Sequence, residues 1–217
     1  MKSERYSFKK KSPQDMIAQS NKLMREMLNR RSIRDFSSKE IPEIVIKNVL
    51  KTAMAAPSGA NKQPWKFVVV KDKNIKKEIR IAAEKEEKKF YENRATEEWL
   101  KDLNKFGTDW NKPFLENAPA LIIVFRQSYD NSGGDRRKNY YVNESVGIAC
   151  GFLLMALQNA GLVSLTHTPS PMGFLERILK RPKNEKAYLL IPVGFPTESA
   201  EVPLLNKKAY NRSVEVF

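Results

Sequence analysis

Residues 55–70, AAPSGANKQPWKFVVV, join the end of a predicted helix to the start of a predicted strand. Two prolines and a glycine restrict the backbone of the loop between them, and a serine, an asparagine and a glutamine offer donors and acceptors for hydrogen bonds. A plain connection could be shorter, because every ordered residue costs conformational entropy. We therefore expect this loop to be shaped around something that it holds.

Apolar patterns on both sides of the loop predict alternating helices and strands. Proline is favoured in a first helical turn, so Pro13 is expected to begin the first helix. The stretch 141–160, which turns almost wholly apolar after Ser145, predicts a central core helix or a subunit interface. The predicted helices cover 13–29, 42–53, 74–92, a segment before Pro119, 141–160 and 173–180, and the predicted strands cover 66–72, 118–125, 162–168 and 186–196.

These elements predict an α+β fold, in which helices flank a small mixed β-sheet. The chain has 217 residues, of which 41% are hydrophobic and 29% charged, as is typical of a globular domain with a proper core. No repeat or linker stands out. We assign 1–217 to a single domain, with 1–12 flexible and a flexible loop at 128–138.

Composition also argues against several classes of protein. The longest apolar runs are far shorter than the ~20 residues of a membrane span, and the charged N-terminal segment lacks the apolar core of a signal peptide. The single cysteine, Cys150, excludes an internal disulfide, and we expect it in the core. One histidine and one cysteine are too few for a zinc site. We expect a cytoplasmic protein with no membrane contact and no metal.

The formal net charge of +14 allows two interpretations. Basic proteins often bind nucleic acid, and we keep that class as an alternative. However, lysines and acids are mixed in stretches such as KDKNIKKEIRIAAEKEEKK (71–89), a pattern typical of a solvated helix face. We favour attraction of anionic small molecules and expect no nucleic-acid partner.

Motifs for hydrolysis and for nucleotide phosphates are absent from the sequence. No G-x-G-x-x-G follows a strand, and there is no G-x-x-x-x-G-K-[ST]. A Ser-His-Asp triad would have to use His167, which lies between two threonines in a predicted strand and is more typical of a structural histidine. If the protein is an enzyme, a cofactor is expected to supply the chemistry.

The segment RRSIR (30–34) places three arginines and a serine within five residues. A basic helix end, favoured by the helix dipole, explains the segment without any ligand. A phosphate site explains it equally well, because guanidinium groups bind phosphate oxygens in pairs and a serine hydroxyl adds a donor. Composition alone leaves both interpretations open.

RRSIRDF (30–36), followed by APSGANKQPWKFVVV (56–70), resembles the FMN-dependent nitroreductase superfamily. The resemblance implies a nitroreductase-like fold and an intertwined homodimer that binds FMN between its subunits. In that family the arginine segment binds the FMN phosphate, and the loop lies against the flavin. The cofactor-binding residues implied are Arg30, Arg31, Ser32, Ile33, Arg34, Ser58, Gly59, Thr166, His167, Thr168 and Lys207.

Two of these positions depart from the family pattern. His167 stands where the family commonly has another threonine, and Lys207 or Lys208 stands where it has a phosphate-binding arginine. Lysine keeps the charge but not the two-pronged geometry of arginine. The resemblance gives Ser58 and Thr168 catalytic roles beside the flavin, and it places Thr168 near the flavin N5.

Further stretches, such as TDWNKPFLENAP (108–119), resemble the iodotyrosine deiodinase branch of the superfamily. There a lid, here about 84–113, binds the amino-acid part of a halotyrosine through Glu87, Tyr91 and Lys112. The charges of these residues suit that role, because an ammonium group needs an anion and a carboxylate needs a cation. The resemblance also directs the backbone N–H of Ala60 to the substrate phenolate.

The resemblance therefore implies FMN-dependent reductive dehalogenation of mono- or diiodotyrosine, or of related halotyrosines, with release of halide and tyrosine. The expected electron donor is NAD(P)H or a reductase or ferredoxin-type protein. A general NAD(P)H-dependent nitro or quinone reductase is the alternative within the same superfamily.

Overall fold

The computed structural model describes residues 2–131 and 134–217, and the chain divides into two compact units between Arg30 and Arg31. In the first unit, α1 (Pro13–Leu28) begins at the predicted proline. The Ser12 side chain accepts a hydrogen bond from the Asp15 N–H at 3.1 Å and caps the helix. No residue of α1 is buried. The assignment of 1–217 to one domain and the flexibility of 1–12 stay predictions, and residue 1 lies outside the described residues.

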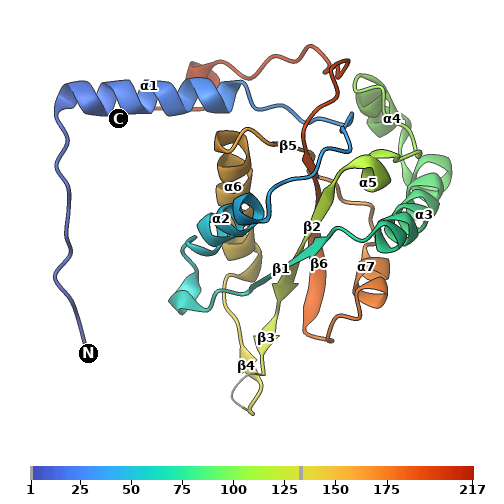
Figure 1. Ribbon diagram of the computed structural model, residues 1–217, viewed down its shortest axis with the longest axis horizontal. Helices are drawn as coiled ribbons and strands as arrows, with labels where there is room; N and C mark the ends of the chain where they lie inside the picture. Colours follow the sequence, from blue (N-terminus) through green and yellow to red (C-terminus); the bar gives the residue numbers. More distant parts are fainter. Residues whose placement is uncertain (1, 132–133) are drawn as a thin grey trace. The chain divides into compact units, whose positions relative to one another are not determined.

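The second unit contains the predicted core elements (Figure 1). Its helices are α2 (Glu43–Met54), α3 (Lys73–Lys89), α4 (Glu97–Asn104), α5 (Phe114–Asn117), α6 (Val142–Asn159) and α7 (Gly173–Ile178), with short turns at Gly59–Asn61, Phe90–Arg94 and Tyr210–Arg212. Its strands are β1 (Trp65–Val70), β2 (Ala120–Gln127), β3 (Tyr129–Asp130), β4 (Arg137–Lys138), β5 (Val163–Ser164) and β6 (Glu185–Gly194). The loop expected at 128–138 thus includes two short paired strands, and its residues 132 and 133 lie outside the described residues.

The main sheet has the strand order β1-β2-β6-β5, and each neighbouring pair is antiparallel. Among the described residues, the parallel pairing of the expected mixed sheet is limited to a single bridge between Ser32 and Ser164. This bridge attaches the segment that follows Arg30 to the edge of the sheet. The α+β class is confirmed.

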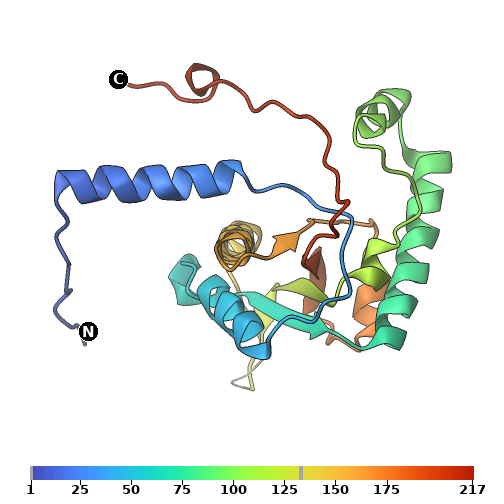
Figure 2. The ribbon, with the colours of Figure 1, turned by 45° about the horizontal axis from the view of Figure 1, so that its top comes forward.

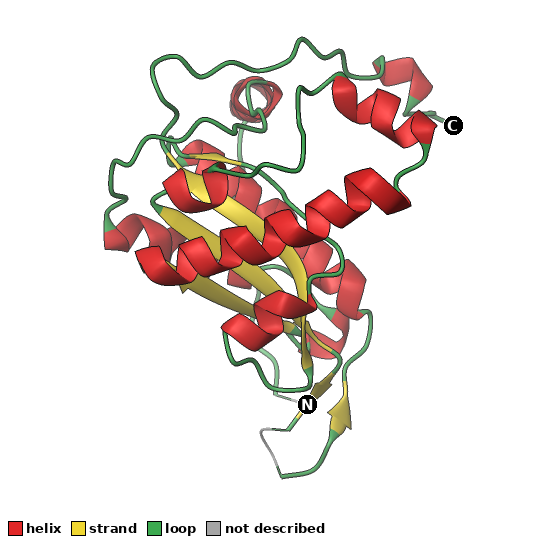
Figure 3. Cartoon of the chain, turned by 90° about the vertical axis from the view of Figure 1, so that its right-hand side faces the viewer, coloured by secondary structure: helices red, strands yellow, loops and turns green. Residues whose placement is uncertain are grey.

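Helices cover both faces of the sheet (Figures 1 and 3). Successive side chains of a strand point to opposite faces, so Ile122 and Val124 of β2 pack in the cluster that includes α2 and α6. Leu121 and Ile123 pack in the cluster that includes α3, α5 and α7. All four side chains are fully buried. The unbroken apolar run of this strand therefore reflects burial on both faces.

The long helix α6 is a core helix, as predicted. Six of its residues are buried, and Cys150 is among them. Burial raises the pKa of the Cys150 thiol to about 12, so the thiol stays protonated and unreactive at neutral pH. Ile148 on another face of the helix is 43% exposed.

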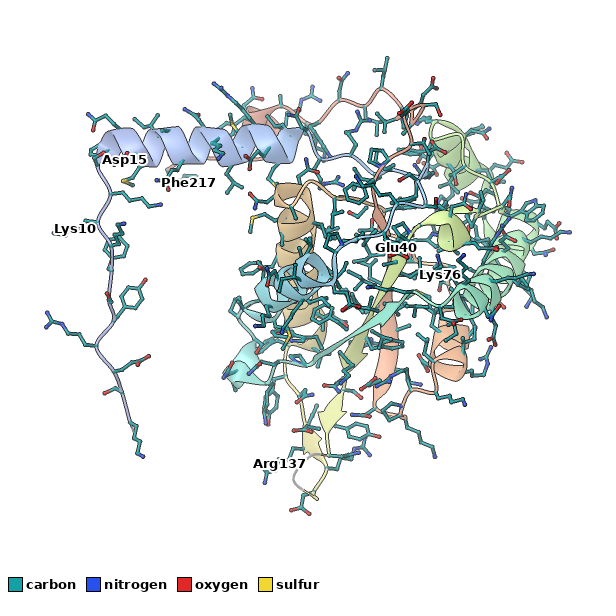
Figure 4. All side chains as sticks on the ribbon, in the orientation of Figure 1. Lys10, Asp15, Glu40, Lys76, Arg137 and Phe217 are labelled. Carbon is teal, nitrogen blue, oxygen red and sulfur yellow. The ribbon has the colours of Figure 1, made fainter. Side chains whose placement is uncertain are left out.

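Lys76 fixes the start of α3 against α5. The side chain, labelled in Figure 4, is buried, and its Nζ donates hydrogen bonds to the Glu116 carbonyl at 2.9 Å and to the Ala118 carbonyl at 2.7 Å. Burial lowers the pKa of Lys76, and the two carbonyl oxygens partly compensate for the lost hydration. The helix that carries Glu87 is thereby anchored at its first turns.

Within residues 2–131 and 134–217, every helix is too short or too polar to cross a lipid bilayer. The same residues contain no group of three or more histidine, cysteine, aspartate or glutamate side chains placed to hold a metal ion.

Candidate active site

The loop that precedes β1 is held by its own hydrogen bonds and by α6. The Ser58 hydroxyl accepts a hydrogen bond from the Gln63 N–H at 2.9 Å. The Gly59 N–H donates to the Ser145 hydroxyl of α6 at 3.4 Å. A Cβ atom on Gly59 would lie 2.8 Å from Cδ2 of Tyr141, so glycine permits the close approach of this loop to α6.

Three non-glycine residues of the loop have left-handed backbone conformations. Their φ angles are 49° at Ala60, 52° at Asn61 and 48° at Gln63. Each such conformation costs about 1–3 kcal/mol and persists only where the surroundings impose it, often at ligand sites. The loop therefore has a fixed and costly shape, in agreement with the expectation that it holds a ligand.

Glu87, Tyr91 and Lys112 come together in the structure. The Lys112 Nζ lies 3.4 Å from Oε2 of Glu87 and 5.5 Å from the ring centroid of Tyr91. Glu87 belongs to the last turns of α3, and Tyr91 to the π-helical turn Phe90–Arg94, in which the Ala95 N–H bonds to the Phe90 carbonyl. Such wide turns are frequent at functional sites.

Several hydrogen bonds fix Lys112 and Tyr91. The Lys112 backbone N–H donates to Oε1 of Glu84 at 2.8 Å, and Glu84 is paired with Arg80 at 2.8 Å. The Lys112 Nζ also donates to the Thr108 hydroxyl at 3.0 Å and to the Asp109 carbonyl. The Tyr91 hydroxyl donates to the Thr108 carbonyl at 3.1 Å. The cation and the phenol are thus attached to the same short loop.

These residues line a cavity of about 290 Å³. The cavity also contains side chains from the arginine segment and from the stretch after β5, which the sequence predicted to face the flavin. Its lining consists of Arg34, Glu87, Phe90, Tyr91, Trp99, Leu103, Thr108, Lys112, Thr166, His167, Thr168 and Ser170.

Burial dominates the electrostatics of the cavity. It raises the pKa of Glu87 and lowers the pKa of Lys112, and in each case the opposite charge of the other residue limits the shift. Burial also raises the pKa of Tyr91, whose hydroxyl therefore stays protonated. Glu87, Lys112 and Tyr91 thus present an anion, a cation and a phenolic donor, a set that suits a zwitterionic amino acid, and Arg34 adds a second cation to the lining.

The arginine segment lies beside the stretch 164–168. The Ser32–Ser164 bridge and the hydrogen bond from the Ile33 N–H to the Ser164 carbonyl, at 3.2 Å, hold the two together. Arg31 donates from Nη2 to the Pro203 carbonyl and is half-buried. Thr166 and Thr168 are exposed. This donor set of guanidinium groups and hydroxyls fits the phosphate and ring of a flavin nucleotide.

Some predicted site residues are not brought to this cavity. Lys207 is exposed in the C-terminal segment, and the role of Arg30, which belongs to the first unit, stays a prediction. Figures 1 and 2 place the Gly59–Asn61 turn on the α2 and α6 side of the sheet and α3 on the other side. Ser58, Gly59 and Ala60 thus lie apart from Glu87 within one chain.

Several residues of the site were not predicted from the sequence. Trp99 and Leu103 line the cavity from α4, and their four-residue spacing could have identified a helix face. Thr108 accepts from both Tyr91 and Lys112, and no local pattern marks it. The contact of His167 with Glu87 was also missed, since the sequence placed His167 toward the flavin.

A family model described as the nitroreductase family matches residues 27–195. The chain belongs to the nitroreductase family. A relative from Haliscomenobacter hydrossis, named iodotyrosine deiodinase, is 59% identical over 197 residues, which cover 90% of this chain and 89% of that protein. Human iodotyrosine deiodinase 1 is 45% identical over 196 residues, which cover 89% of this chain and 68% of that protein.

Solved structures of the nitroreductase family share this fold. The crystal structure of an oxidized iodotyrosine deiodinase bound to FMN and 3-iodo-L-tyrosine has a TM-score of 0.76 and 33% identity, and the match covers 89% of this chain and all of that chain. A Bacteroides fragilis nitroreductase with bound FMN has a TM-score of 0.66 at 20% identity, covering 91% of this chain and 99% of that chain, and shows likeness of fold alone. The resemblance inferred from the two sequence motifs is confirmed. The roles of the individual site residues stay predictions.

Proposed function

We propose that this nitroreductase-family protein is an FMN-dependent enzyme that reductively removes halide from mono- or diiodotyrosine or related halotyrosines. The observation that carries the proposal is the meeting of Glu87, Tyr91 and Lys112 in one cavity beside Thr166 and Thr168. The relatives named iodotyrosine deiodinase, and the structure of one of them with FMN and 3-iodo-L-tyrosine, support this substrate and this cofactor.

Side chains of this protein bind the amino-acid group of the substrate. Glu87 receives the substrate ammonium, Lys112 receives its carboxylate, and the Tyr91 hydroxyl adds a donor. For this the Glu87–Lys112 pair, now 3.4 Å apart, separates and each member takes a substrate partner of opposite charge. The net charge of the cavity is unchanged when a zwitterion enters, so neither residue is left with an uncompensated charge.

FMN, when bound, supplies the two electrons that, with one proton, replace the halogen by hydrogen and release halide. Arg31, Ser32 and Arg34 would hold its phosphate, and Thr166 and Thr168 would supply hydroxyl groups to its ring. The Ala60 N–H, held by the fixed backbone of its loop, would be the donor to the substrate phenolate. NAD(P)H or a ferredoxin-type reductase is the proposed electron donor, and the cytoplasm is the proposed location.

A homodimer explains why the loop and the cavity lie on opposite sides of the sheet in one chain. A second copy can bring its Ser58, Gly59 and Ala60 to the flavin that the first copy binds at Arg34. Exposed apolar side chains on and beside α6 support such an interface, since Ile148 is 43% and Tyr140 52% exposed. Sedimentation analysis should give twice the chain mass.

Release of iodide tests the proposed function. The purified protein should be yellow, should release FMN on denaturation, and with dithionite should convert iodotyrosine into tyrosine and iodide. Dithionite removes any dependence on the natural donor. A protein that reduces nitroaromatics or quinones with NAD(P)H but neither binds nor deiodinates iodotyrosine would favour the general reductase. A colourless protein that cannot be reconstituted with FMN would exclude both.

Arg31→Ala is expected to weaken FMN binding by about tenfold, because a charge-assisted contact to phosphate is lost. The remaining arginine and serine donors keep the effect from being larger. FMN dissociation constants of the apoprotein variants measure it. Arg137→Ala is the matched control, since Arg137 is exposed on the separate β3–β4 pair (Figure 4). Equal FMN affinity in both variants would place the phosphate elsewhere.

A further inference from the structure

His167 is the only histidine of the chain, and its position is tightly fixed. Its backbone N–H donates to the Leu190 carbonyl at 2.9 Å, and its carbonyl accepts from the Leu190 N–H at 3.0 Å. The imidazole meets the Phe114 ring edge-on, with centroids 5.4 Å apart. The side chain is 11% exposed, whereas the neighbouring Thr166 and Thr168 are exposed. The ring therefore points into the protein, away from the side that the threonines face.

The Nε2 atom of this ring is buried and has no hydrogen-bond partner among residues 2–131 and 134–217. Buried polar atoms without partners are rare and costly, and each requires an explanation. Oε1 of Glu87 lies 3.9 Å away, about 1 Å beyond hydrogen-bond length. A small rotation of the Glu87 side chain would close this gap.

Lys112 is not available as the partner of Nε2. A lysine has three N–H donors. Those of Lys112 are directed at the Thr108 hydroxyl, the Asp109 carbonyl and Oε2 of Glu87. Oε2 of Glu87 thus faces the lysine, and Oε1 faces the histidine. The two oxygens of one carboxylate have different neighbours.

The imidazole is neutral. Burial, reinforced by the positive charges of Lys112 and Arg34, lowers the pKa of His167 to about 3, and Glu87 is the acid that faces the ring from α3. A neutral imidazole carries a proton on one nitrogen only. A bare Nε2 would direct its lone pair at a carboxylate oxygen, so the proton belongs on Nε2.

We propose that His167 is a positioning residue for substrate recognition, whose Nε2–H donates to Oε1 of Glu87 and holds that carboxylate ready for the substrate ammonium. This inference rests on the proposed function. When Lys112 turns to the substrate carboxylate, Glu87 loses its partner at Oε2. His167 then keeps the carboxylate oriented, so the histidine acts on the amino-acid group and not on the phenol.

The first test uses the single histidine as a spectroscopic probe. In ¹⁵N-labelled full-length protein, one imidazole contributes all of the histidine ring signals. A neutral Nε2–H tautomer is expected between about pH 5 and 8, and its Nε2 resonance should shift in Glu87→Gln. A ring protonated at Nδ1 alone, or one that titrates near its ordinary pKa of about 6.5, would overturn the proposal.

The second test is a double-mutant cycle. His167→Phe keeps a ring against Phe114 but removes the donor, and His167→Gln restores an N–H near the Nε2 position. Iodotyrosine affinity is expected to fall about tenfold in His167→Phe and to recover in His167→Gln. In a Glu87→Gln background, His167→Phe should add little. In His167→Phe the fall in iodotyrosine affinity should exceed any fall in FMN affinity or in the turnover of 2-iodophenol, which lacks the amino-acid group.

The outcomes separate this inference from the proposed function. If the unmodified protein fails to bind iodotyrosine, the proposed function and the role of His167 in recognition both fail. If it binds iodotyrosine and His167→Phe binds equally tightly, or if the losses at His167 and Glu87 simply add, only the positioning role fails. Parallel losses in FMN affinity and in turnover of 2-iodophenol would show a structural role for His167 and would also overturn it.

Discussion

Glu87→Gln is expected to lower iodotyrosine affinity by about 1.5–3 kcal/mol, or roughly 10–150-fold, while leaving reduction of a small nitroaromatic nearly intact. The substitution keeps the size of the side chain but removes the charge that faces the substrate ammonium. A nitroaromatic carries no ammonium group and uses only the flavin. Both activities are measured on one preparation with dithionite as the reductant.

Glu78→Gln is the matched control for this experiment, because Glu78 lies on the same helix but is exposed.

Acidification should lower iodotyrosine affinity, as Glu87→Gln does. Burial raises the pKa of Glu87, so its carboxylate takes up a proton at a higher pH than an exposed glutamate would, and the attraction for the ammonium is lost as the pH falls. If Glu87→Gln lowered activity on iodotyrosine and on the nitroaromatic equally, Glu87 would support the fold or the flavin instead.

Ile79→Ala is expected to lower the free energy of unfolding by about 2–5 kcal/mol. Ile79 is fully buried in the cluster beneath α3, and truncation leaves a cavity that the surrounding side chains fill only in part. Chemical denaturation followed by circular dichroism measures the change. The stability of the holoprotein is compared at one FMN concentration, since bound ligand raises apparent stability.

Ile81→Ala is an unusually close control, because it makes the same chemical change two residues further along α3. Ile81 is 59% exposed, so its truncation is expected to change stability by no more than about 0.5 kcal/mol. Similar losses at both positions would mean that α3 does not pack on the sheet through Ile79. The pair thus tests the orientation of the helix that presents Glu87.

The sequence was most informative where one physical signal dominates. Proline chemistry placed the start of α1 at Pro13, and the apolar run at 141–160 predicted α6 within a residue or two. The strand expected at 162–168 is shorter, because only Val163 and Ser164 pair continuously with β6 before the chain returns to it at His167. Apolar alternation indicates which side chains are buried, but not how far backbone pairing extends.

The site was predictable only in part, for a related reason. The charges of Glu87 and Lys112, and the fit of the arginine segment to phosphate, could be read from residue types once the family was recognised. The contact between His167 and Glu87 joins residues that are distant in sequence, and it depends on the register of β6 against the stretch after β5. Local periodicity carries no information about such a contact.

The left-handed residues at 60, 61 and 63 bear on how this chain could be adapted to other halophenols. Glycine at these positions would relieve backbone strain, but it would also widen the range of conformations that the loop samples. The present residues keep one loop conformation, and the phenol-binding donor proposed there is a backbone group, whose chemistry no side-chain exchange alters. Laboratory evolution toward new substrates should therefore randomise residues 84–113, which include the residues proposed to bind the amino-acid part of the molecule, and leave the 60–63 loop unchanged.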